Sequence, residues 1–349
     1  MIKAKERDAI IQALHAGIVP RIGLQHIVVD RKQEIKALME DLKRISDGSA
    51  TFRFVVGYYG AGKTFLLHLV KTYALKQGLV TVHADLTPDR RLHGTQGKAR
   101  NLFSELMKNM ATLSKPDGGA LPNVLERFIN SVSSEAEESN TEQKSIFDKK
   151  LASIIDLASG YDFATVINAY WKGFNDDNEE LVASAIRWLR GEFLTKTAAK
   201  HALKVGKIVD DTNIYDFLKL IAEFVKMCGY KGLLVGLDEM VNLYRLSNTR
   251  ARNSNYEKIL GILNDCIQGS TSHVGFILSG TPNFLTDTRK GVFSNDALRS
   301  RLEENRFASA SGVIDLRAPV IRLKNLSKED LYMLLTHGSL KLSTGFEKC

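Results

Sequence analysis

The 349-residue sequence predicts an α/β protein with a parallel β-sheet flanked by helices and interrupted by a large helical insertion. Short apolar runs alternate with segments of helical apolar spacing, which is the pattern of parallel strands joined by right-handed crossovers. A long stretch of helical spacing separates the second run from the third. We expect the strands at 52–56, 79–86, 232–239, 274–279 and 318–323.

The elements before and around the first strand follow from apolar periodicity. Residues 4–17 have helical spacing, and residues 32–47 form an amphipathic helix whose apolar positions run from Ile35 to Leu42 on one face. The strand FRFVV is followed by a glycine-rich turn and then by a helix over 63–77. This order of strand, turn and helix opens an α/β unit.

The insertion between the second and third strands is expected to be helical. Leu102, Leu106 and Met110 share one helical face. Within the insertion, the polar and acidic run SVSSEAEESNTEQK at 131–144 predicts an exposed loop. After the third strand, a helix is expected around 254–268.

The glycine-rich turn after the first strand matches the phosphate-binding pattern GxxxxGK[ST]. Glycines let backbone N–H groups turn inward without Cβ clashes, and the N-terminus of the following helix favours an anion. We expect Lys63 to reach the β and γ phosphates of ATP and Thr64 to ligate Mg²⁺. The expected nucleotide contacts are Gly57, Tyr58, Tyr59, Gly60, Ala61, Gly62, Lys63, Thr64 and Phe65.

An Asp-Glu pair ends the strand LLVGLDE and is the expected second half of such a site. Asp238 is expected to hold the magnesium shell, as the Asp after the corresponding strand does in P-loop NTPases. Glu239 is expected to orient and polarise the attacking water, a group that a pure ATP-binding switch does not need. The fold class is therefore that of a P-loop NTPase.

Two further segments carry candidate residues with two interpretations each. Thr281 or Ser279, after a strand expected beside the phosphate strand, can sense the γ-phosphate, or the segment is a Gly-Pro-Asn turn. Arg299 or Arg301 can act as an arginine finger, or both lie on a helix surface with i,i+4 charge pairs.

Composition limits the remaining classes. The net charge of +8 permits a nucleic-acid partner, and the basic run DRRLHGTQGKAR at 89–100 is either a phosphate-backbone contact or a solvated loop. Three widely spaced cysteines favour neither a disulfide framework nor a zinc cluster. No run of 18 apolar residues and no secretory signal occur, so we expect a cytoplasmic protein without a membrane partner.

These motifs, in this order, resemble the AAA+ ATPases, especially the branch of origin-recognition, helicase-loading and transposition ATPases. The run HIVVDRKQEI at 26–35 looks like the segment beside the adenine, with Asp30-Arg31 in place of the usual Gly-Arg. A narrower resemblance rests on AIRWLRGE, GYKGLLVGLDEMVNLYRL and GVFSNDALRSRL. It is to the ATP-binding proteins of bacterial bacteriophage-exclusion (BREX) and related defence clusters, over about residues 10–335.

The resemblance implies a division of the chain and a truncated lid. We expect an adenine-side segment at 1–48, the start of the ATPase core at 49–87, a helical insertion at 88–230 and the rest of the core at 231–325. The strand-to-lid passage begins at Ile321, and residues 326–349 are expected to form an incomplete lid that lacks the class's further nucleotide-sensing arginine.

Two functions follow from these expectations. The first is an ATPase that remodels or loads a partner, works in phage defence with other defence proteins or on DNA, and forms a homo-oligomer through an arginine finger. The second is a nucleotide-gated binding module with little or no hydrolysis. Glu239 favours the first, and the short lid favours the second.

Overall fold

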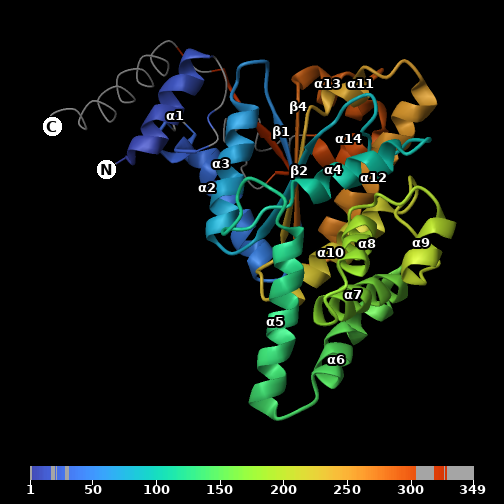
Figure 1. The fold of residues 1–349 in the computed structure, drawn as a ribbon. Helices are drawn as coiled ribbons and strands as arrows, with labels where there is room; N and C mark the ends of the chain where they lie inside the picture. The colour runs from blue at the N-terminus through green and yellow to red at the C-terminus, as the bar shows by residue number, and fades with distance from the viewer. Residues whose placement is uncertain are drawn as a thin grey trace, which may run out of the picture. The chain divides into compact units, whose positions relative to one another are not determined.

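The computed structural model describes residues 2–16, 20, 22–27, 31–303, 318–325 and 327. The fold is a five-stranded parallel sheet flanked by helices. Figure 1 shows helices on either side of the strands, and the strand order is β2-β3-β4-β1-β5. The strands are β1 (Thr51–Val56), β2 (Val80–Asp85), β3 (Leu233–Asp238), β4 (Val274–Gly280) and β5 (Val320–Arg322). The predicted fold class is confirmed, and β4, which contains Ser279 and ends just before Thr281, neighbours β1 as expected.

The helices fall into three stretches of the chain. Before β2 lie α1 (Ala4–His15), the 3-10 turn η1 (Leu24–His26), α2 (Lys32–Ser46) and α3 (Lys63–Lys76). Between β2 and β3 lie α4 (Lys98–Lys108), α5 (Leu121–Ser139), α6 (Gln143–Ile155), α7 (Gly160–Asn175), α8 (Glu179–Leu189), α9 (Lys196–Leu203) and α10 (Ile214–Met227). After β3 come α11 (Val241–Tyr244), α12 (Thr249–Gln268), α13 (Pro282–Thr286), η2 (Val292–Ser294) and α14 (Asp296–Leu302). None of these helices is long and apolar enough to cross a membrane.

The described chain divides into two compact units. The first contains the described residues up to Asp41, Arg53–Tyr73 and those from Ile277 onward. The second contains Leu42–Phe52 and Ala74–Phe276. Parts of β1 and β4 therefore belong to each unit.

The first unit is held together around β1. β1 pairs with β5 in parallel register, Val55 opposite Ile321. The side chain of Arg53 on β1 is buried and donates to both carboxylate oxygens of Asp41 on α2, with 3.0 Å from Nη2 to Oδ1. The same guanidinium donates to the carbonyl of Ala318. This buried ion pair fastens α2 and the approach to β5 onto β1, and removal of either charge would leave the other uncompensated.

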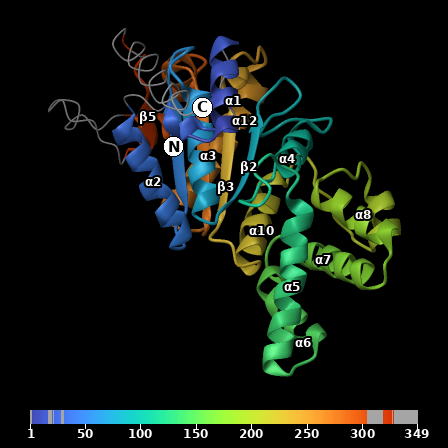
Figure 2. The same ribbon diagram turned by 60° about the vertical axis from the view of Figure 1, so that its left-hand side comes forward.

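The second unit combines the β2–β3 pair with the helical insertion. Consecutive helices pack on one another, α5 on α6, α6 on α7, α7 on α8 and α8 on α9. Figures 1 and 2 both show α5 to α8 as one group of helices in the green part of the chain. Its core contains an aromatic cluster in which Phe224 of α10 lies 5.2 Å from Phe128 and 5.5 Å from Phe163, between ring centroids. The insertion therefore has a core of its own.

The prediction of an exposed loop at 131–144 is wrong. α5 continues to Ser139 and α6 begins at Gln143, so only residues 140–142 connect them. Val132 and Ala136 are buried and extend the apolar face of α5 by another turn. Glu135 between them pairs with Lys150 of α6 at 2.7 Å, and Glu137 and Glu138, which follow Ala136, are exposed. Burial of two small apolar side chains at i,i+4 outweighs the polar composition of the segment.

Several expectations lie outside the described residues. The expected adenine-side segment includes residues 28–30, and the expected lid covers residues 326–349. Of these positions, the structure describes Ser327 alone.

Candidate nucleotide-binding site

The P-loop lies in the first unit, between β1 and α3. The N–H of Gly57 donates to the carbonyl of Gly280 at the end of β4, at 3.2 Å. A Cβ on Gly57 would lie 3.0 Å from the Cβ of Ala61 and 3.2 Å from the Cβ of Leu323. Position 57 is therefore a glycine because β5 and the loop's own far side approach the backbone too closely for a side chain.

Gly60 and Gly62 are glycines for a different reason. Their φ angles are +80° and +84°, in the left-handed region, and no heavy atom lies within 4 Å of a Cβ built on either. Left-handed residues let successive N–H groups converge on one point, which makes an anion-binding concavity. The loop therefore has the backbone conformation that phosphate binding needs.

Lys63 and Thr64 form the first turn of α3. The Lys63 ammonium donates to the carbonyl of Tyr58 at 2.9 Å and lies 5.5 Å from the ring centroid of Tyr59. Both tyrosines are exposed, at 61% and 66%, and Thr64 is exposed as well. A lysine ammonium and the N-terminus of a 14-residue helix thus place positive charge beside the glycine concavity.

The sensor candidates lie at the carboxyl end of β4, beside the P-loop. Ser279 is fully buried, and Thr281 is buried with its hydroxyl accepting from the N–H of Phe284 at 3.4 Å. Thr281 is thus the N-cap of α13, and Pro282 and Asn283 lie in the first turn of this short helix. The bond from Gly57 to Gly280 brings the chain just before Thr281 next to the start of the P-loop.

The two arginine-finger candidates lie on α14. Arg299 is paired with Glu303 at 3.6 Å, one helical turn on, and about half of each side chain is exposed. Arg301 donates from Nη1 to the carbonyl of Ala297 at 2.8 Å, also at an exposed position. Both arginines make the local contacts of a helix surface, and both remain accessible to a second molecule.

The acidic pair lies in the second unit, where β3 ends. Asp238 is buried, at 6% exposure, and its Oδ1 accepts from the N–H of Glu239 at 2.7 Å. Glu239 is exposed and has a φ of 55°, a conformation uncommon for a residue other than glycine. Asn242 bonds the carbonyl of Leu86 at 2.7 Å, and Leu86 N–H bonds the carbonyl of Asp238 at 3.0 Å. The turn after β3 is therefore fixed against the end of β2, with Glu239 projecting to solvent.

Asp85 is a further acidic residue of this region that the sequence motifs do not include. It ends β2 in register with Asp238, so both residues lie on the same face of the sheet. Asp85 is exposed; partial desolvation and the negative charge of Asp238 raise its pKa, while the charge of Arg90 lowers it. A second strand ending in Asp, LVTVHAD, was the available signal, because carboxyl ends of adjacent parallel strands meet at one edge.

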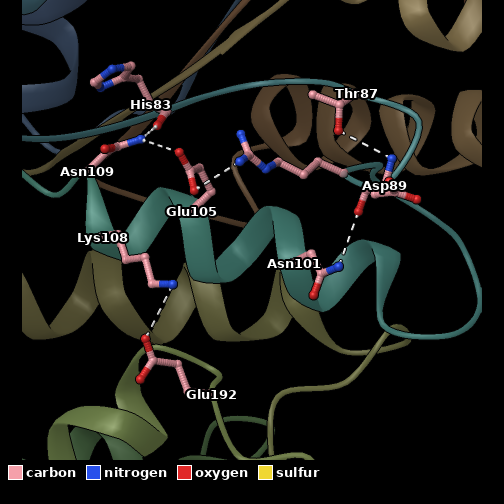
Figure 3. A network of polar contacts seen from close by, with 9 residues as sticks. His83, Thr87, Asp89, Asn101, Glu105, Lys108, Asn109 and Glu192 are labelled. Atoms are coloured by element: carbon pink, nitrogen blue, oxygen red, sulfur yellow. Dashed lines mark hydrogen bonds and ion pairs between the residues drawn. The ribbon is translucent and has the colours of Figure 1, made fainter.

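The basic run at 89–100 is held to the rest of the second unit (Figure 3). Arg90 pairs with Glu105 of α4 at 3.4 Å, and Asn109 bonds both Glu105 and the carbonyl of His83. The Asp211 carboxylate accepts three backbone N–H groups from the start of α4, at 2.7 to 3.1 Å. The run is therefore neither a free loop nor wholly solvated.

A comparison with known protein families identifies the family of this chain. The family model described as "BREX system ATP-binding protein BrxC/D" matches residues 2–338, almost the whole sequence. The chain belongs to this family. The BrxC/D family protein is accordingly an ATP-binding protein of the BREX system, as the sequence resemblance implied. No curated protein matches it.

Membership in the BrxC/D family indicates that the chain binds ATP. The family binds ATP, and the converging glycines, Lys63 and the N-terminus of α3 are the groups in this chain suited to its phosphates.

Proposed function

We propose that this BrxC/D family protein is a Mg²⁺-dependent ATPase of the AAA+ type that acts in phage defence. The observation that carries the proposal is the P-loop itself, with left-handed Gly60 and Gly62 ahead of Lys63 and the first turn of α3. The backbone from Gly57 to Phe65 binds the phosphates, and Lys63 contacts the β and γ phosphates.

Two side chains of the chain would hold the Mg²⁺ ion. The donors are the Thr64 hydroxyl and the Asp238 carboxylate, both oxygen ligands of the kind Mg²⁺ prefers. Magnesium in nucleotide sites uses one or two carboxylates together with substrate phosphates, so it does not need a protein-only cluster. Within the described residues, no group of three or more His, Cys, Asp or Glu side chains could hold a metal. When bound, the ion neutralises charge on the β and γ phosphates.

Glu239 is proposed as the residue that orients and polarises the attacking water. Its side chain is exposed, and its backbone is held in a left-handed conformation by the turn after β3. Strained backbone that the surroundings maintain is often found at functional sites. The assignment of Asp238 and Glu239 to the same reaction as the P-loop rests on the order of the motifs along the chain.

Turnover is proposed to need a second copy of the chain. Thr281 is assigned as the γ-phosphate sensor, and Arg299 or Arg301 as a finger given to a neighbouring subunit. The exposure of both arginines on α14 supports this role, because a finger must reach another molecule. The nucleotide-gated module without hydrolysis is the alternative.

A nucleic-acid partner has a specific observation in its favour. Lys196 and Lys200 are exposed at i,i+4 spacing on α9, Lys204 is exposed immediately after the helix ends, and no acidic residue occurs between Glu192 and Asp210. Like charges at this spacing destabilise a helix slightly, so a polyanion is a fitting counterpart. DNA is the partner we propose for this surface.

The test of the proposed function is ATP binding and phosphate release by wild type and Lys63→Ala, with and without Mg²⁺. Loss of the charge-assisted contact should weaken ATP binding strongly, and chelation of Mg²⁺ should stop phosphate release. Phosphate release that is independent of Mg²⁺, or ATP binding equal in Lys63→Ala and wild type, would contradict the proposal. ATP binding without any release would favour the nucleotide-gated module.

A further inference from the structure

Arg31 connects three distant parts of the first unit at the P-loop. It immediately precedes α2, and its side chain is buried, at 7% exposure for the residue. Its Nη2 donates to the carbonyl of Ala61 within the P-loop at 3.3 Å, and to the carbonyl of Lys324 after β5. Its Nη1 lies 3.5 Å from a carboxylate oxygen of Glu34. The guanidinium therefore has an ion-pair partner and two backbone acceptors.

The contact with Ala61 has a consequence for the adjacent N–H group. The carbonyl of Ala61 and the N–H of Gly62 belong to one planar peptide unit, and no described peptide bond is cis. In a trans peptide the two groups point in opposite directions. A donor that holds the Ala61 carbonyl on one side therefore directs the Gly62 N–H to the other side.

The loop does not fix this peptide by its own side chains. Gly60 and Gly62 flank Ala61, and a Cβ on either would meet no heavy atom within 4 Å. Glycine has the widest choice of backbone conformations, so the peptide between Ala61 and Gly62 can rotate at low cost unless another group restrains it. Arg31 supplies such a restraint from a segment 30 positions earlier in the chain.

We propose that Arg31 is a positioning residue for the phosphates of ATP. It holds the Ala61–Gly62 peptide with its N–H toward the glycine concavity, and so prepares the loop before nucleotide arrives. A preorganised donor binds an anion more tightly than one that must first be ordered. The inference rests on the proposed phosphate-binding role of the P-loop and adds a residue that the motif does not contain.

The test compares Arg31→Met and Arg31→Lys with wild type. Methionine keeps much of the length and removes every donor, and lysine keeps the charge but loses the planar fork that serves several acceptors. The dissociation constants of ATP and ADP should both rise, by about tenfold for Arg31→Met and less for Arg31→Lys. Without nucleotide, hydrogen exchange of residues 57–66 should be faster in Arg31→Met.

The matched control is Arg53→Lys. Arg53 is a second buried arginine of the same unit, which also bonds a carboxylate and a backbone carbonyl but does not contact the P-loop. We expect Arg53→Lys to lower the thermal midpoint while leaving ATP affinity and exchange at 57–66 near the wild-type values. If Arg31 variants bind ATP as wild type does, the inference is wrong.

Two further outcomes separate the possible roles. If affinity falls in both arginine variants in proportion to their loss of thermal midpoint, Arg31 is merely structural and the inference is overturned. If wild type itself binds no ATP, the proposed function fails. Exchange at 57–66 then still decides whether Arg31 orders the loop.

Discussion

Replacement of Gly57 by alanine tests the close approach at the start of the P-loop. The added Cβ would lie 3.0 Å from the Cβ of Ala61 and 3.2 Å from that of Leu323. Carbon atoms prefer a separation of about 3.5–4.0 Å, so the loop and β5 must move apart by roughly half an ångström. Neither neighbour moves freely, because Leu323 N–H bonds the carbonyl of Val56 at 2.7 Å and both neighbouring side chains are buried.

The expected cost is that of overpacking, about 1–3 kcal/mol. For a chain longer than 250 residues this lowers the thermal midpoint by roughly 2 °C for each kcal/mol, or about 2–6 °C. ATP affinity should fall as well, because the displaced backbone carries the phosphate donors. The assay is thermal denaturation followed by circular dichroism, with an ATP titration on the same preparations.

Gly261→Ala is the control for this prediction. Gly261 is exposed within α12, and no heavy atom lies within 4 Å of a Cβ built there. Alanine should stabilise that helix by about 0.5–1 kcal/mol. An unchanged midpoint and unchanged ATP affinity in Gly57→Ala would refute the steric account of the loop.

Because the pKa of Asp85 is raised, its ionised form weakens the fold as pH rises above the ordinary carboxyl pKa, so Asp85→Asn should raise the thermal midpoint more at about pH 7 than at about pH 4; an equal gain at the two pH values would contradict the raised pKa. Arg301→Ala should bind ATP yet release little phosphate. Mixing it with Glu239→Gln should restore part of the activity, because one subunit then supplies an intact Arg301 and the other an intact Glu239; an inactive mixture would exclude an arginine finger given to a neighbouring subunit. Reversing the charges of Lys196, Lys200 and Lys204 should weaken DNA binding and reduce its salt dependence while ATP affinity stays constant; DNA binding that is unchanged at low salt would exclude this surface as the DNA contact.

The P-loop and the strands could be predicted because their signals are local. The spacing of glycines before Lys63 dictates a turn, and each strand of the sheet is a short apolar run that ends within a few residues of its predicted bounds. The AAA+ order of motifs also predicts that β4 lies beside β1, as it does in the sheet.

The parts that were missed depend on tertiary contacts. The helix over 131–139 is hard to predict because serine and glutamate dominate its composition. Val132 and Ala136 are the two apolar residues in that stretch that mark its buried face. The register of Asp85 with Asp238 requires knowledge of which strands pair. The contact of Arg31 with Lys324 joins residues 293 positions apart, which no local pattern encodes.

We propose that this ATP-binding protein hydrolyses ATP and that Glu239 is the residue that activates water. The most direct test of this claim is steady-state phosphate release by Glu239→Gln and wild type, measured with Mg²⁺ on samples whose ATP affinity has been determined. The amide keeps the shape of the side chain and loses the base, so ATP affinity should be unchanged and phosphate release should be lost. Equal rates of phosphate release in the two proteins would contradict the claim.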